Sequence, residues 1–337
     1  MTAQARLRAV EAAPAAPRVL PVDPIGWTSH AMHAADRHWP QTNCYADLWI
    51  EVLGALGLEP AACFGFAISQ DFEGDQFTFF KPPLEDLEAL FGLRATELAL
   101  YDDLVGHLEL QAERGRLVLI ELDSHWLPDT RGITYREAHG KTTVAINRID
   151  REARELDYFH NEGFFRASGE DFDGLFRLAP GLAREDRQYP YAEMVRLPKR
   201  LPTREETAAA ALPTFLKHLR RRPDVNPVAA FRKVVAAQAG ALAGRETEAF
   251  HHYAFNTLRQ LGANFELYAD HLGWLAVDGL DDAKAASIEI AEGAKVAQLH
   301  LARAVRQMSF ARLDGALAEV EAAHDRLVAA LVARFPD

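Results

Sequence analysis

Cysteine is scarce in this sequence: 337 residues include only two, Cys44 and Cys63, which cannot form a disulfide framework. Long apolar runs are missing too, since no stretch of about 18 apolar residues occurs, and we expect no membrane span. Positive charge is in deficit, and a formal net charge of −12 argues against a nucleic-acid partner. Residues 1–17 lack the apolar core of a signal peptide. These absences predict a cytoplasmic globular protein.

Signatures of bound cofactors are also missing. Gly163, Gly169 and Gly174 are too scattered to form a phosphate-binding loop. The histidine-rich stretch at residues 30–38 matches no common metal-site spacing and contains no cysteine. We therefore expect neither a metal nor a cofactor.

Hydrophobic patterning divides the chain into three parts. Residues 1–25 are rich in Ala and Pro with little periodicity, and we expect them to be disordered or loosely attached. Residues 26–200 mix helical and strand patterns, which predicts an α+β domain. Two prolines and basic residues at 197–203 mark a boundary. Residues 201–337 read as a helical bundle domain, with apolar residues stepping by three and four along 313–331.

Within the α+β part, the pattern becomes helical from Asn43, and Thr42 or Asn43 can cap the first turn. The apolar run at 62–68 and the aromatic run at 77–80 predict short strands. Residues 117–122 predict a buried strand. Residues 142–149 and 156–160 predict a hairpin whose polar turn lies at 150–154.

Cys44 is the candidate nucleophile because it stands at a predicted helix start. The positive end of a helix dipole stabilises a thiolate, which is the reactive form of cysteine. Cys63, by contrast, lies inside an apolar run and is expected in the core.

A cysteine nucleophile needs a base and a group that orients the base. His139 and Asn161 flank the predicted hairpin, and their midpoint, residue 150, falls at its polar turn. Cross-strand neighbours approach within about 5 Å, so the two side chains are expected side by side. The Cys44 N–H, with a side-chain amide of Gln41 or Asn43, could bind an oxyanion. Asp123, His125 and Trp126 follow a buried strand, and we expect them to line the substrate site.

Several of these segments carry a family resemblance over about residues 38–177. They are the cysteine at a helix start, the Cys-Phe-Gly-Phe segment at 63–66, the strand and loop at 119–128, the strand led by His139 and the strand that ends at Asn161. The chain resembles papain-like cysteine acyltransferases of the butirosin biosynthesis protein H type, and is more distantly similar to the leader peptidases of bacteriocin exporters.

The resemblance implies a papain-like domain with Cys44 as nucleophile, His139 as base and Asn161 as orienting residue. The relatives usually have Asp-Pro where this chain has Asn161, which leaves His160 or Asp157 as alternatives. The implied reaction moves an acyl or aminoacyl group from a carrier-protein or pantetheine thioester to a small-molecule or peptide amine. A cysteine peptidase or amidase with the same residues, and a non-catalytic interaction protein, are the other readings.

A basic segment interrupts the acidic sequence. Between residues 196 and 233 ten Lys and Arg face three acids, and Arg220, Arg221 and Arg222 are consecutive. A basic patch attracts acidic partners, so an acidic carrier protein could dock there; a solvated helix face is the simpler interpretation.

Overall fold

The computed structural model describes residues 16–178 and 188–336. Its N-terminal half is built on an antiparallel six-stranded sheet in the order β1-β6-β2-β3-β4-β5. The strands are β1 Arg94–Glu97, β2 Arg116–Asp123, β3 Lys141–Asp150, β4 Glu155–His160, β5 Gly163–Ser168 and β6 Ala192–Arg196. Mixed helix and antiparallel strand, as predicted, thus make up this half.

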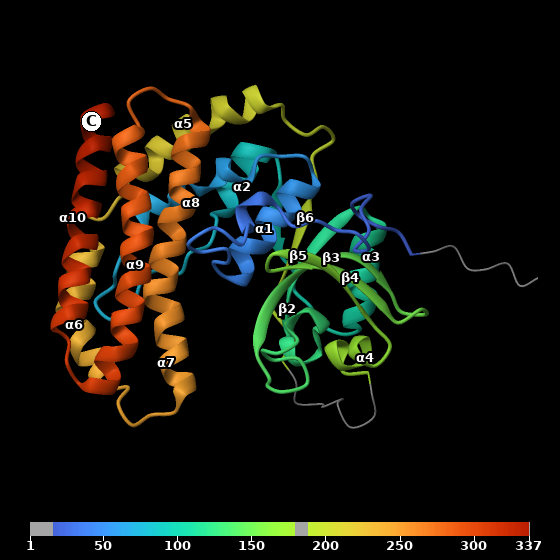
Figure 1. Ribbon diagram of the computed structural model, residues 1–337. Helices are drawn as coiled ribbons and strands as arrows, with labels where there is room; N and C mark the ends of the chain where they lie inside the picture. The colour runs from blue at the N-terminus through green and yellow to red at the C-terminus, as the bar shows by residue number, and fades with distance from the viewer. Residues whose placement is uncertain (1–15, 179–187, 337) are drawn as a thin grey trace, which may run out of the picture.

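Helices cover both faces of the sheet because its central strands are apolar on both sides (Figure 1). Leu117 and Leu119 of β2 face α1 (Cys44–Ala55), whereas Val118 and Ile120 face α3 (Leu104–Glu113). α4 (Glu170–Phe176) adds to the α3 side. This alternation follows from the two-residue period of a strand.

The remaining α-helices form the C-terminal domain, apart from the short α2 at Leu84–Phe91. They are α5 Arg204–Arg220, α6 Pro227–Gly240, α7 Thr247–Ala254, the π-helical turn Phe255–Arg259, α8 Gln260–Leu275, α9 Asp281–Gln307 and α10 Ala311–Arg334. The helical domain is therefore confirmed, and its predicted apolar seam is buried along α10.

The two halves share one core. The Trp39 indole N–H donates to the Ala291 carbonyl at 2.9 Å, and a Cβ at Gly262 would lie 2.4 Å from that indole ring. Likewise, a Cβ at Gly65 would lie 2.7 Å from His271 Nε2. α1 is consequently enclosed, with residues 45–53 all buried between the sheet and α8 and its neighbours.

Two predicted strands are wrong. Pro60–Ser69 is a 3₁₀ helix, and residues 77–80 contribute only an isolated bridge between Phe72 and Phe77. A short apolar run without alternation fits a buried helix as well as a strand. Here the run contains the close approach of Gly65 to α8, and Cys63 is buried in it as predicted.

The predicted hairpin has a different register. Asp150 pairs with Glu155, so the turn is centred between residues 152 and 153, and β3 has an irregularity between Ile146 and Arg148. The midpoint at residue 150 is therefore wrong, and β4 ends before any residue that could face His139. On its other side β3 pairs Lys141 with Asp123 of β2.

Residues 1–25 were expected to be disordered or loosely attached. Residues 1–15 lie outside the described residues, but residues 19 and 20 are held firmly, which contradicts the expectation there. Leu20 is buried, and Val19 N–H donates to the Asn147 carbonyl at 2.9 Å. The Asn147 side chain accepts from Leu20 N–H at 2.7 Å and donates to its carbonyl at 3.1 Å. One buried amide thus fixes this segment beside β3.

Asn147→Ala should release this segment. Two backbone groups of Leu20 lose their buried partner, which costs about 1–3 kcal/mol. Urea unfolding should show that loss, and limited proteolysis should cut within residues 16–30. Asn256→Ala, at an exposed position, should change neither. An unchanged cleavage pattern in Asn147→Ala would contradict the assignment.

Candidate functional site

Cys44 lies in a cavity of about 760 Å³ that both halves of the chain line. The first residues of α1, the start of β3, Asn161 and the π-helical turn form its walls. Turns of this kind recur at functional sites. The cavity residues used below are Gln41, Asn43, Cys44, Lys81, Thr142, Thr143, Asn161 and Arg259.

The Cys44 thiol is half-buried and sits at the first position of α1. Asn43 caps the helix, because its side-chain oxygen accepts from Tyr45 and Ala46 N–H at 3.1 and 3.0 Å. Thr143 N–H donates to Cys44 Sγ at 3.4 Å. The helix dipole and this N–H both favour negative charge on sulfur.

Gln41 and Asn43 were the two side-chain amides expected to bind an oxyanion, and the structure places them differently. The prediction that Asn43 binds an oxyanion is wrong, because its buried NH₂ group already donates to the Phe80 carbonyl at 2.9 Å and to Gln260 Oε1 at 3.1 Å. Gln41 lines the cavity; its NH₂ donates to Glu162 and its oxygen accepts from Arg259 at 3.2 Å. The Cys44 N–H has no acceptor within its own helix and is free to bind an oxyanion.

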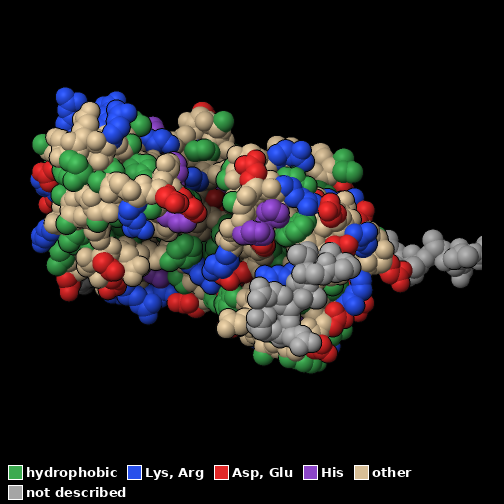
Figure 2. Space-filling view, turned by 90° about the horizontal axis from the view of Figure 1, so that it is seen from below, with side chains coloured by type: hydrophobic (Ala, Val, Ile, Leu, Met, Phe, Trp, Pro, Cys, Tyr) green, Lys and Arg blue, Asp and Glu red, His purple; other side chains and the backbone are tan. Residues whose placement is uncertain are grey.

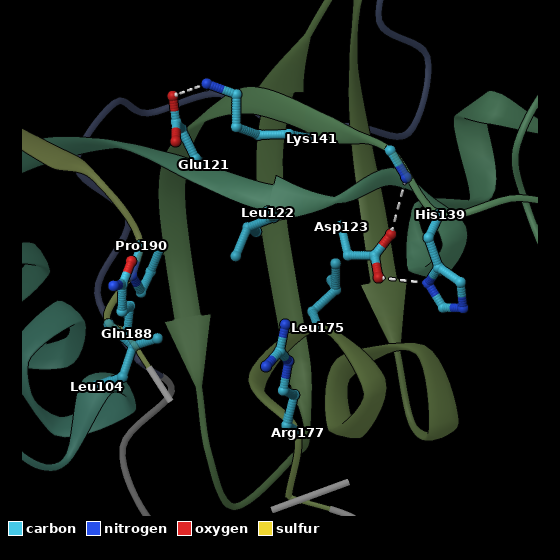
Figure 3. Close-up of a pocket in the computed structure, with 11 residues that line it drawn as sticks. Leu104, Glu121, Leu122, Asp123, His139, Lys141, Leu175, Arg177, Gln188 and Pro190 are labelled. Carbon is cyan, nitrogen blue, oxygen red and sulfur yellow. Dashed lines mark hydrogen bonds and ion pairs between the residues drawn. The ribbon is translucent and has the colours of Figure 1, made fainter. Parts of the chain in front are cut away.

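His139 lies in a second cavity, of about 370 Å³, instead of the Cys44 cavity. Its Nδ1 is 2.7 Å from Asp123 Oδ2 (Figure 3). Its ring stacks on the His125 ring, with the two centroids 4.4 Å apart. The His139 side chain is 73% exposed. An ion pair between Glu121 and Lys141, 2.7 Å long, stands on the wall that the two cavities share.

The predicted Cys44, His139 and Asn161 set is therefore not brought together in one cavity. Asn161 does line the Cys44 cavity, in the turn between β4 and β5 with φ of 47°. The partner of His139 is Asp123, and Asp157 is buried in an ion pair with Arg166 at 2.6 Å. Among the described residues no imidazole lines the Cys44 cavity.

Of the three expected substrate-lining residues, only Asp123 lines either cavity. The His125 ring stacks on the His139 ring and meets the Trp126 ring edge-on, with the latter two centroids 4.9 Å apart. The Trp126 indole packs on α4, where a Cβ at Gly174 would lie 2.0 Å away. Trp126 thus holds α4 to the loop after β2, and its role as a substrate contact stays a prediction.

A buried hydroxyl–imidazole–carboxylate chain reaches the Cys44 cavity through Thr142, and the sequence interpretation missed it. Thr142 Oγ1 is 2.7 Å from His160 Nε2, and His160 Nδ1 is 2.6 Å from Asp129 Oδ2. The Tyr158 hydroxyl donates to the other Asp129 oxygen at 2.5 Å. This order matches that of a nucleophile or proton carrier activated by a His-Asp pair. A threonine opening one strand and a histidine ending the next were the available signal.

Arg220 is the last residue of α5, and Arg221 and Arg222 follow it on the loop that leads to α6. That loop contacts α10, since Asn226 donates to the Glu321 carbonyl at 3.0 Å and to Asp325 at 2.8 Å. α10 stands at the edge of the molecule away from the sheet (Figure 1). Lys217 and Arg232 of the basic segment are ion-paired, and acidic and basic side chains intermingle on the face shown in Figure 2.

Residues 16–178 and 188–336 contain neither a candidate metal centre nor a candidate membrane-spanning helix. No group of three or more His, Cys, Asp or Glu side chains there could hold a metal ion. His33 is buried with Nδ1 2.7 Å from the Pro40 carbonyl. None of the helices in these residues has the length and apolarity to cross a membrane.

Asp47, on the cavity wall, provides a test of the site's electrostatics. Burial raises its pKa to about 8, although both of its oxygens accept from Thr42 N–H at 2.9–3.0 Å. The folded protein therefore holds a proton that the unfolded chain loses near pH 4. Stability contributed by this proton is present at low pH and is lost as pH rises toward 8.

Asp47→Asn should remove this pH dependence. Urea unfolding at pH 5 and pH 8 should show the wild type losing about 2 kcal/mol or more relative to the variant, since each pKa unit corresponds to about 1.4 kcal/mol. Asp75→Asn, at an exposed position, should parallel the wild type. Equal pH dependence in Asp47→Asn and the wild type would contradict a raised pKa.

Comparison with known proteins matches the two halves separately. The DUF1839 N-terminal domain matches residues 28–197, and the DUF1839 C-terminal domain matches residues 204–333. No curated protein matches the chain. The matched segments cover most of the sequence, and the chain belongs to the DUF1839 family.

Proposed function

We propose that this protein is an acyltransferase that takes an acyl group from a thioester onto Cys44 and passes it to an amine. One observation carries the proposal: Sγ sits at a helix N-terminus, receives the Thr143 N–H at 3.4 Å and faces a cavity large enough for a substrate. These are conditions that favour a thiolate nucleophile.

The absence of an imidazole from the described wall of the cavity favours a thioester over an amide. An amide releases an amine, which must be protonated as it leaves, and cysteine peptidases use histidine for this. A thioester releases a thiolate, which needs no such acid. A peptidase or amidase would need the Thr142–His160 relay to protonate its leaving amine in the first step, whereas transfer from a thioester needs that relay only in the second.

The first step forms a C–S bond between Cys44 and the acyl carbon. The carbonyl oxygen takes up negative charge, which the Cys44 N–H and the Gln41 amide would stabilise. The tetrahedral adduct then collapses, the donor's C–S bond breaks, and the donor leaves as a thiolate. The acyl group is now a thioester of Cys44.

The second step transfers the acyl group to an amine. The amine nitrogen bonds to the acyl carbon, and Cys44 leaves as a thiolate. The amine's extra proton passes to Thr142 Oγ1 while the Thr142 hydroxyl proton passes to His160 Nε2. Asp129, 2.6 Å from Nδ1, stabilises the imidazolium that forms. After the amide has left, that proton passes back through Thr142 to solvent, where it balances the donor thiolate released in the first step.

We also propose a papain-like relationship for the N-terminal domain. A helix that begins with the nucleophile and packs on an antiparallel sheet supports it. In this proposal Asn161 keeps a place in the cavity, and His160 replaces His139 as the base, acting through Thr142.

The proposed donor remains a carrier-protein or pantetheine thioester. Docking of a carrier protein at Arg220, Arg221 and Arg222 has little support, because their loop packs against α10 at the edge away from the sheet. We propose that the donor is recognised near the cavity.

Incubation with acyl-pantetheine thioesters should add one acyl mass to the protein, detected by intact mass spectrometry. Cys44→Ala should abolish the adduct, and Cys63→Ala should retain it because Cys63 is buried. Cleavage of peptide amides without any adduct would favour the peptidase. Absence of both activities, with Cys44 alkylated by iodoacetamide no faster than a free thiol, would favour a non-catalytic protein.

His160→Gln and Thr142→Val should separate the two steps. We expect the Cys44 adduct to form at the wild-type rate and its transfer to an amine to slow about 100-fold or more, since general base catalysis contributes about 10²–10⁴. Thr142→Ser should retain most transfer. Tyr158→Phe removes a hydrogen bond to Asp129 but leaves the Thr142–His160 contact, and should transfer normally. If all four variants transferred the acyl group at the wild-type rate, the relay would be excluded.

A further inference from the structure

Of the three cationic side chains that line the Cys44 cavity, Arg259 is the one with no carboxylate partner among the described residues. It ends the π-helical turn, and its guanidinium lies 5.0 Å from the centroid of the Phe255 ring. One nitrogen, Nη2, donates to Gln41 Oε1 at 3.2 Å. Its Nε is buried and has no hydrogen-bond partner among the described residues.

The other cations of this wall are neutralised. Lys81 pairs with Glu193 at 2.8 Å, and Lys141 pairs with Glu121 at 2.7 Å. For Arg259, no carboxylate oxygen of the described chain lies within the 4.0 Å that defines an ion pair. This difference marks Arg259 as the one available for an anion.

Asp47 and Glu162 are the two acids whose negative charge acts on Arg259, and both have other hydrogen-bond partners. Asp47 accepts Thr42 N–H with both oxygens, and burial raises its pKa to about 8, so it is largely neutral at pH 7. Glu162 accepts the Gln41 amide. Burial lowers the pKa of Arg259 itself, yet a guanidinium stays protonated at neutral pH. A half-buried charge with a free N–H is costly unless a ligand pairs with it.

We propose that Arg259 binds a carboxylate of the substrate, so that the acyl group or its amine acceptor is a carboxylic acid. This inference rests on the proposed function, because it takes the molecule bound by Arg259 to be the substrate of that reaction. Arginine presents parallel N–H groups that match a carboxylate. A phosphate brings about two negative charges at neutral pH, and the neighbouring Glu162 would repel the second, which favours a singly charged group.

The test measures protection of Cys44, which requires no turnover. Iodoacetamide alkylates Cys44, and the rate is followed by mass spectrometry with straight-chain carboxylates from acetate to hexanoate and with their uncharged amides. In the wild type at least one carboxylate should slow alkylation about fivefold or more, and the amide of equal length should not. Arg259→Met should lose this protection, and Arg259→Lys should keep part of it.

Arg232→Met is the matched control, because Arg232 lies on α6, paired with Asp314 of α10. It should be protected like the wild type. Circular dichroism checks the folding of each variant. If Arg259→Met unfolds, Arg259→Lys still tests the assignment. Equal protection by acids and amides, protection that persists in Arg259→Met, or no protection by any acid would overturn the assignment.

The outcomes separate this inference from the proposed function. Protection by carboxylates without any acyl adduct on Cys44 would keep the Arg259 site and end the acyltransferase. An acyl adduct without carboxylate protection would do the reverse.

Discussion

The buried side chain of Asn43 connects three parts of the molecule around the sulfur of Cys44. Its oxygen caps α1, and its NH₂ group donates to the Phe80 carbonyl and to Gln260 of α8. Gln260 in turn donates to the Thr42 carbonyl at 3.0 Å. The helix start, the segment before α2 and the C-terminal domain are therefore fixed to one another. The position of the sulfur relative to β3 and to Arg259 depends on these bonds.

The cavity is consequently a joint product of both halves of the chain. The N-terminal half contributes Cys44, the proposed nucleophile, and the strand that donates Thr143 N–H to it. The C-terminal half contributes the π-helical turn that carries Arg259. Trp39 and Gly65, each pressed against the C-terminal helices, keep the halves in one core. The helical domain thus forms part of the wall of the candidate site.

Local signals predicted the helix start at Cys44 well, whereas pairing across the sheet could not be predicted from spacing. An N-cap residue followed by an apolar helical pattern places a helix start within a residue or two, and here Asn43 does so. The position of His139 depended on the centre of a turn, and the real turn lies between residues 152 and 153 with an irregularity in β3. A shift of register changes every cross-strand neighbour. The contact of Thr142 with His160 follows from that register, and Asp129 joins them from a distant loop.

The most direct test of a transferring Cys44 is a single-turnover chase. Protein acylated on Cys44 is freed of donor and mixed with a primary amine, and the acyl group is followed in protein, amide and free acid. The proposal predicts that acyl lost from Cys44 appears as amide, one for one. Acyl that stays on the protein, or that appears as free acid at a rate independent of amine concentration, would contradict it.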